Sequence, residues 1–292
     1  MAQYKPHYFL FGRFMFQHFV ITRFNLRKKG WQTSKSNTQV LTDTWMENRL
    51  ALFENYCFSS LVAQTKQNFT WLVFFDTTTP EKFRTVIARL ESTFNQFTPI
   101  YIDGMDEFLN QSRVQIQQRL NQPYVITSRL DNDDSLHQDY IKEVQSHFAQ
   151  QSFMAIDFVD GYTLQVEPHV FFAKRSHVHN PFLSLIEKAD QIKTVWYLDR
   201  HGQWTDVKEL IPVRNKPMWM SVIHMENKVN TFLGFDNVPW QVISEFNLNK
   251  DVEKTLEKNR VPFASWKSKS LKNKLKTMWK VNFKLFKRRI LG

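Results

Sequence analysis

The sequence contains few glycines. There are seven among its 292 residues, and none of them forms a GxGxxG or GxxxxGK[ST] motif. The absence of both motifs excludes a Rossmann pyrophosphate turn and a P-loop. If the chain binds a nucleotide, something other than a glycine-rich loop must neutralise its phosphates.

Cysteine is scarcer still. Cys57 is the only one, so the chain can form neither an intrachain disulfide nor a cysteine-based zinc site, and a reducing compartment fits best. No stretch approaches the ~20 apolar residues that a membrane-spanning helix needs. The apolar run at 7–21 is interrupted by Arg13, Gln17 and His18 and lacks a small-residue cleavage site. We therefore expect the protein in the cytoplasm.

Acidic residues are missing from the C-terminal segment. Ten Lys or Arg and no Asp or Glu follow from Lys267 onward, so the net charge of +11 leaves the first 266 residues at about 11 − 10 = +1. Apolar residues at a helical spacing alternate there with lysines, which predicts a basic amphipathic helix over 267–292 on an anionic membrane surface. Nucleic-acid binding and a solvated disordered tail are the alternatives. The near-neutral body makes a nucleic-acid partner the weaker one.

The rest of the chain predicts an α/β fold. Short apolar runs alternate with segments of helical period, which is typical of a sheet with crossover helices. We expect most of the 27 Phe and 9 Trp residues to fill the core. The expected strands are 18–24, 71–76, 97–102, 124–130, 153–159 and 169–174. The expected helices are 44–65, 80–92, 107–120, 135–148 and 181–189. The pattern weakens after residue 236, so we divide the chain into 1–235, an extension at 236–266 and the basic helix.

An acidic run, Asp131-Asn132-Asp133-Asp134, directly follows one expected strand. Ligands of open α/β sheets bind beyond the carboxyl ends of strands, and a hard divalent cation would relieve the repulsion between these carboxylates. The alternative is a solvated turn in which Asp133 or Asp134 caps a helix that starts near Ser135. An EF-hand is excluded, because the sixth and twelfth loop positions hold Leu136 and Lys142.

Four segments give the run a context. MFQHFVITRFNLR (15–27), the segment 44–76, YVITSRLDNDDSL (124–136) and KPMWMSVIHMENKVN (216–230) together resemble the bacterial putative rhamnosyl transferase family. This resemblance covers roughly residues 15–230 and implies a GT-A-like nucleotide-sugar-binding fold with a mostly parallel central sheet. One departure is Phe58-Ser59-Ser60, where a Pro-Ser pair is expected.

The resemblance also implies a site. The acidic run would be the DXD element of a metal-dependent glycosyltransferase, with Mn²⁺ or Mg²⁺ as cofactor and a nucleoside-diphosphate sugar as donor. The implied metal ligands are Asp133, Asp134 and His224. The implied donor-binding residues are Arg23, Asn25, Asp76, Arg129 and Asp131. For Asp76, capping of the following turn is an equal alternative, and Arg129 could simply offset the neighbouring carboxylates.

Glycosyl transfer with inversion also needs a carboxylate that takes a proton from the acceptor hydroxyl. Asp157, Asp160, Glu167 and Glu187 lie downstream of the acidic run, and Asp160 and Glu187 are the preferred candidates for this catalytic role. The expected acceptor is a glycan or lipid-linked saccharide at the inner face of the cytoplasmic membrane, and rhamnose enters only through the family name. The rival functions are a metal-dependent nucleotidyl- or phosphotransferase and a non-enzymatic nucleic-acid-binding protein.

Overall fold

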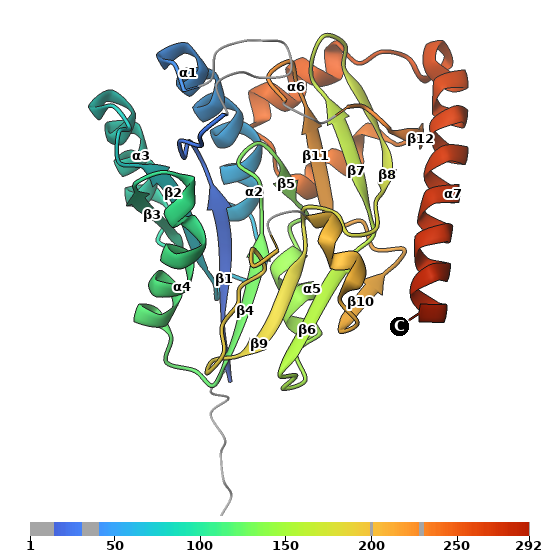
Figure 1. Ribbon diagram of the computed structural model, residues 1–292. Helices are drawn as coiled ribbons and strands as arrows, with labels where there is room; N and C mark the ends of the chain where they lie inside the picture. Colours follow the sequence, from blue (N-terminus) through green and yellow to red (C-terminus); the bar gives the residue numbers. More distant parts are fainter. Residues whose placement is uncertain (1–14, 31–40, 199–200, 228–230, 292) are drawn as a thin grey trace, which may run out of the picture.

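The computed structural model of the chain describes residues 15–30, 41–198, 201–227 and 231–291, so part of the N-terminal apolar run lies outside the described residues. Two β-sheets form the centre of the protein (Figure 1). The first has seven strands in the order β10-β6-β9-β4-β1-β2-β3. Its four neighbouring strands β4, β1, β2 and β3 are parallel, and β9 runs antiparallel to both β4 and β6. The mostly parallel α/β fold is thereby confirmed. The strands are β1 (Phe16–Arg23), β2 (Thr70–Asp76), β3 (Phe97–Ile102), β4 (Tyr124–Arg129), β6 (Phe153–Phe158), β9 (Ser184–Lys188) and β10 (Leu210–Val213).

The first sheet is buried on both faces, which explains its continuous apolar runs. In β2, Trp71, Val73 and Phe75 pack into one core cluster, whereas Leu72 and Phe74 pack into another on the opposite face. The first cluster includes side chains of α1, α3 and α5, and the second includes those of α4. The helices are α1 (Asp43–Leu52), the π-helix η1 (Phe53–Phe58), α2 (Ser59–Val62), α3 (Glu81–Thr93), η2 (Met105–Glu107), α4 (Phe108–Arg119) and α5 (Tyr140–Ser146).

The second sheet has five strands in the order β12-β8-β7-β11-β5. Most of its strands were not predicted from the sequence, because they are short and their apolar pattern is interrupted. Val222 and Leu164 pack with η4 and α6 in a third core cluster. The elements are β5 (Ser135–Leu136), β7 (Asp160–Gln165), β8 (Phe171–Ser176), β11 (Trp219–Ile223), β12 (Phe235–Asn237), η3 (His201–Asp206), η4 (Trp240–Phe246), α6 (Lys250–Lys258) and η5 (Phe263–Trp266).

Two predicted helices were wrong. Residues 181–189 contain strand β9, whose Leu185 and Ile186 pack on opposite faces of the first sheet, so the alternation of a two-sided strand was misread as a helical period. The helix expected at 135–148 begins only at Tyr140, because Ser135 and Leu136 pair with β11. Neither Asp133 nor Asp134 therefore caps that helix.

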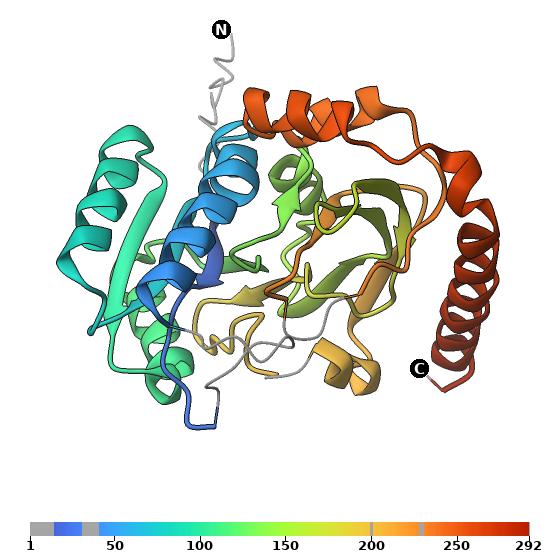
Figure 2. The same ribbon diagram turned by 90° about the horizontal axis from the view of Figure 1, so that it is seen from above.

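The C-terminal segment forms the long helix α7 (Lys267–Leu291), as predicted. Figures 1 and 2 both show it at the outer edge of the molecule, on the side opposite α3. It packs beside β12 and β8. Across the described residues, no helix has the length and apolarity required to span a membrane.

Candidate functional site

The acidic run links three elements at the carboxyl end of the first sheet. Asn132 donates its amide hydrogens to the carbonyl oxygens of Arg23 and Phe24, at 3.2 and 3.0 Å, which ties the run to the end of β1. After the run, the hydroxyl of Ser135 donates to the carbonyl of Tyr56, in the π-helix that continues α1. A π-helical turn of this kind is often found at functional sites. Here it lies next to the acidic run.

Asp133 is the centre of the site. Its Oδ2 accepts from Arg49 Nη1 at 2.8 Å, lies 2.9 Å from His224 Nε2 and accepts from Asn227 Nδ2 at 3.2 Å. The side chains of Asp133, Arg49 and His224 are all almost fully buried. Burial alone would raise the pKa of Asp133, but Arg49 and His224 outweigh it, so the pKa lies below its ordinary value and the carboxylate is charged.

His224 Nε2 lies between the carboxylate of Asp133 and the side-chain amide of Asn227. Asn227 accepts the backbone N–H of His224 through Oδ1, so its Nδ2 faces the imidazole Nε2 at 2.9 Å. A protonated Nε2 would meet this donor, and an unprotonated one would place its lone pair against the carboxylate of Asp133. A divalent cation held by Nε2 and Oδ2 would satisfy both groups, and this donor set therefore fits a metal ion. Within the described part of the chain, no cluster of three or more His, Cys, Asp or Glu side chains is arranged around such a position.

Asp134, a predicted metal ligand, points elsewhere. Its Oδ1 accepts the backbone N–H of Val222 at 2.8 Å, and the side chain is buried. Burial and the neighbouring charges of Asp133 and Asp131 raise its pKa well above the ordinary value. Asp134 thus connects the acidic run to β11, whereas Asp133 and His224 are brought together. Their metal-binding role stays a prediction.

Arg49 is the functional residue that sequence reasoning missed. Thr42 caps α1 by accepting the N–H of Trp45, and the first turns then bury Trp45, Met46, Arg49 and Leu50 on one face. The signal was a charged residue inside an apolar helical stripe. Its guanidinium lies over the ring of Trp45, 5.1 Å from the centroid, and bonds Asp133. Among the described residues, its buried Nε has no hydrogen-bond partner.

Two further arginines meet on one tryptophan. The guanidinium groups of Arg23 and Arg129 lie 4.7 and 3.8 Å from the ring centroid of Trp196, which is itself buried and donates to the carbonyl of Ile21. Arg129 also pairs weakly with Asp131, at 3.4 Å. These residues come from the ends of β1 and β4, so the site carries positive charge close to the acidic run. Stacking on an indole ring holds each guanidinium in place without consuming its hydrogen bonds.

Asn25 and Asp76 form a separate group at the ends of β1 and β2. Asn25 donates to Thr79 and accepts the N–H of Asp76. The carboxylate of Asp76 accepts from both the backbone and the side chain of Arg27, at 3.0 and 2.8 Å, and from Thr78. Burial opposes this charge, but the hydrogen bonds from Arg27 and Thr78 prevail and lower the pKa of Asp76. The carboxylate is thus engaged within the protein, and half-exposed Arg27 was missed as its partner.

The preferred catalytic carboxylates lie away from this site. Glu187 pairs with Val125 near the start of β4, ~20 Å along the strand from Asp131, and it accepts the N–H groups of Lys193 and Thr194. Asp160 begins β7, at the end opposite His224, and bonds Ser176 and Arg214. The strand register thus places both carboxylates away from Asp133, each in hydrogen bonds within the protein, and their catalytic role is untested.

Glu167 is the downstream carboxylate that reaches the site. It follows β7, whose last residue pairs with Ile223 beside His224, and its Oε2 accepts the N–H of Met225 at 3.4 Å. Its side chain is exposed. A second carboxylate, Glu226, accepts from Asn48 of α1 at 2.8 Å. Asp157, the fourth candidate, is fully buried and bonded to His179 and Asn180.

The parallel strands β3-β2-β1-β4 and the antiparallel β9 beyond them form an α/β fold, with the acidic run at the end of β4. A family model described as putative rhamnosyl transferase matches residues 17–234, so the chain belongs to that family and is a glycosyltransferase. No curated protein matches the chain in sequence.

Solved structures are similar at a distance. The structure of S. aureus TarS 1–349 in complex with UDP-GlcNAc is 10% identical to this chain in sequence. The match covers 82% of this chain and 70% of that one, with a TM-score of 0.41. The mannosyltransferase PcManGT from Pyrobaculum calidifontis with GDP-Man and Mn²⁺ is 11% identical, with coverages of 73% and 58% and a TM-score of 0.41. Against another structure of S. aureus TarS 1–349, the chain spans 60% of that protein. These structural similarities are weak, so the assignment of the chain to a family rests on the family model.

The environment of Glu187 makes its role testable. Burial raises its pKa from 4.5 to about 7, so between these values the folded chain holds a proton that the unfolded chain releases. Stability should therefore fall as the pH rises through this window. We expect Glu187→Gln to reduce this pH-dependent loss of unfolding free energy by about 1–3 kcal/mol, measured in denaturant titrations, and to retain transfer activity. A hundredfold loss of turnover without a change in the pH dependence of stability would instead assign Glu187 to catalysis.

Proposed function

We propose that the protein transfers a sugar from a nucleoside-diphosphate sugar to a saccharide or lipid-linked saccharide acceptor, in a reaction that depends on a divalent cation. The observation that carries this proposal is the convergence of Asp133, His224 and Arg49 on one buried point. Rhamnose is the sugar that the family description suggests.

The negative charge of the donor determines which residues would bind it. A nucleoside diphosphate is strongly anionic, and the chain has no glycine-rich loop to receive it. Asp133 and His224 would hold Mn²⁺ or Mg²⁺, with Asp131 nearby, and the cation would offset negative charge on the departing diphosphate. Arg49, Arg23 and Arg129 add fixed positive charges around the same point. They are already oriented by Trp45 and Trp196, so little reorganisation accompanies the reaction.

The nucleoside end of the donor would lie at the group formed by Asn25, Asp76 and Arg27. Asp76 fixes the guanidinium of Arg27, whose side chain is 47% exposed and can face a ligand. This arrangement supports a positioning role for Asp76, in place of direct hydrogen bonding to the base. The acceptor hydroxyl would lose its proton to Glu167, which is exposed and lies beside His224.

Asp133→Asn tests the metal-dependent reaction. The variant keeps the size of the side chain and removes its charge. We expect normal folding and a loss of turnover of at least ~100-fold, equivalent to ~2.7 kcal/mol. The assay is release of nucleoside diphosphate from donor sugars against Mn²⁺ concentration, and His224→Ala should shift this metal dependence. Asp139→Asn, outside the site, is the control. Release of pyrophosphate would indicate a nucleotidyltransferase, and activity that survives exhaustive chelation would exclude the metal-dependent reaction.

Glu167→Gln tests the assignment of the base. General base catalysis contributes ~10²–10⁴-fold, so we expect a loss of transfer in this range with unchanged donor binding. Glu226→Gln is the control, because that carboxylate also lies next to the His224 segment but is bonded to Asn48. Equal activity of the two variants would remove Glu167 from the mechanism.

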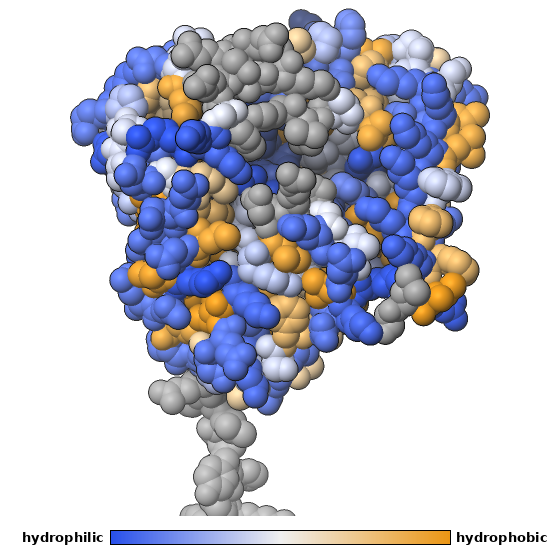
Figure 3. Space-filling view, viewed as in Figure 1, coloured by the Kyte–Doolittle hydropathy of each residue, from blue (hydrophilic) through white to orange (hydrophobic). Residues whose placement is uncertain are grey.

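We further propose that α7 holds the enzyme at the inner face of the cytoplasmic membrane. The helix is attached to the body by polar contacts: Ser270 accepts from Asp236, Asn273 donates to Gly234, and Lys274 pairs with Asp236. Val281 and Leu285 also pack against the body. The larger apolar side chains of the helix point outward instead, and Figure 3 shows orange residues along this edge. The exposed set is Leu271, Leu275, Trp279, Phe283, Phe286 and Ile290.

This orientation is the reverse of an ordinary amphipathic helix, which buries its apolar stripe. An outward apolar stripe with lysines beside it matches the interface of an anionic bilayer in both polarity and charge. A peripheral position would also bring the site to a lipid-linked acceptor. The polar attachment of α7 means that substitution tests this idea better than truncation, because removal of the helix would uncover buried Val281 and Thr277.

The triple substitution Leu275→Gln, Trp279→Gln and Phe286→Gln removes part of the stripe from side chains that are 62–68% exposed. We expect an unchanged melting temperature and a loss of binding to anionic vesicles of at least ~100-fold, because each large apolar side chain contributes ~1.5–3 kcal/mol when buried. Val62→Gln with Ile211→Gln, two exposed sites off α7, is the control. Undiminished vesicle binding, or binding to duplex DNA in place of vesicles, would contradict the proposal.

A further inference from the structure

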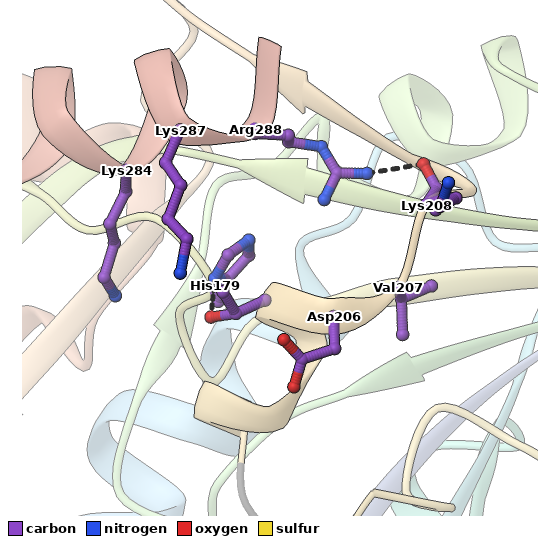
Figure 4. A pocket seen from close by; sticks show the side chains of 8 residues that line it. His179, Asp206, Val207, Lys208, Lys284, Lys287 and Arg288 are labelled. Carbon is purple, nitrogen blue, oxygen red and sulfur yellow. Dashed lines mark hydrogen bonds between the residues drawn. The ribbon is translucent and has the colours of Figure 1, made fainter. Parts of the chain in front are cut away.

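Two adjoining cavities lie between α7 and the body of the protein. The first, of about 250 Å³, is enclosed by the last turns of α7, by η3 and the residue that follows it, and by His179. Figure 4 shows Lys284 and Lys287 extending from α7 toward His179, and Arg288 extending to the backbone of Lys208. Asp206 and Val207 also line the cavity. Lys208 also lines this space. Four cationic side chains therefore surround it, against one carboxylate.

The cationic groups are held by the fold. Arg288 donates to the carbonyl oxygens of Lys208 and Leu210, at 2.6 and 3.0 Å, and Lys284 donates to the carbonyl of Val178 at 3.2 Å. Carbonyl oxygens orient these charges without neutralising them, and the buried carboxylate of Asp157 is the acidic group that offsets part of both. Burial lowers the pKa of both Lys284 and Arg288, so each charge is partly desolvated. An anion in the cavity would offset this cost, because it favours the charged forms.

The second cavity extends this space toward the outward stripe of α7. It measures about 430 Å³ and shares Thr205, Lys284 and Lys287 with the first. Trp279 and Phe283 also line it, and their rings stack at 5.7 Å. Both side chains are more than half exposed and belong to the apolar stripe. The small basic cavity thus opens at the proposed membrane surface into a larger one, whose lining combines these two aromatic rings with the cationic side chains of Arg175, Lys276, Lys280, Lys284 and Lys287.

We propose that the smaller cavity binds the phosphate group of an anionic lipid, in particular a terminal phosphomonoester, while the larger cavity receives the part of the lipid next to that phosphate. This inference rests on the proposed attachment of α7 to a membrane and makes it selective. A phosphomonoester carries more charge than a phosphodiester and has no second substituent, so it suits a narrow space between four cations. A freely soluble phosphate offers the same charge but leaves the aromatic walls without a partner.

Diffuse attraction and a defined site make different predictions for single lysines. Lys287 lines both cavities, whereas Lys272 is an exposed lysine of the same helix that lines neither. If only diffuse attraction to a charged surface holds the helix, loss of either lysine should weaken vesicle binding about fivefold, equivalent to ~1 kcal/mol. We expect Lys287→Gln to weaken binding to phosphatidylcholine vesicles with phosphatidic acid by at least ~10-fold, and Lys272→Gln by about fivefold or less. Asp206→Asn, which removes the opposing carboxylate, should strengthen it.

The experiment measures full-length protein bound to sedimented vesicles that contain either phosphatidic acid or phosphatidylserine, at matched surface charge. Preference for phosphatidic acid that disappears in Lys287→Gln supports the site. Equal binding to both lipids, or equal losses for the two lysine variants, would overturn it while leaving membrane attachment intact. Full competition by inorganic phosphate would instead assign the cavity to a soluble anion. Failure to bind any vesicle would contradict the attachment itself, and donor hydrolysis by each variant checks that the transfer site is unaffected.

Discussion

The candidate site depends on keeping one buried charge, the carboxylate of Asp133, inside the protein. A buried carboxylate is costly unless charged or hydrogen-bonding partners surround it. Arg49 arrives from α1, His224 and Asn227 from the end of β11, and each contacts the same oxygen. The acidic run must also be fixed in the chain, which Asn132 achieves through the end of β1 and Asp134 through β11. Residues distant in sequence thus assemble around this single group.

A second surface of the protein lies along α7. α7 meets the body with Ser270, Asn273 and Lys274, and further along with buried Val281. Its larger apolar side chains are exposed in the described structure. Exposed apolar patches of this kind mark contact surfaces in soluble proteins. The lysines and the basic cavities beside the apolar stripe make that surface positively charged as well as apolar. The transfer site and the proposed membrane surface therefore use different elements of one fold.

Most strands of the first sheet could be predicted from the sequence, because they are strongly apolar runs separated by helical segments. Strand β10 was not among them. Strand β9 could not be predicted, since a strand buried on both faces and a buried helix look alike in one short apolar run. For the site, a resemblance placed Asp133 and His224 together before any geometry was known. Nothing in the sequence separates Glu187 and Asp160 from the acidic run, because only strand register shows that they lie at the ends of their strands away from Asp133. Arg49 was visible only as a charge within an apolar stripe.

The central claim is that Asp133 and His224 hold a divalent cation at the donor site. Electron paramagnetic resonance of Mn²⁺ tests it most directly, with the metal titrated into the full chain alone and then with UDP, GDP or dTDP. The account predicts one immobilised Mn²⁺ per chain, bound more tightly with the matching nucleotide, because both occupy the same point. Immobilised Mn²⁺ that persists unchanged in both Asp133→Asn and His224→Ala, or no bound Mn²⁺ with any of the three nucleotides, would contradict it.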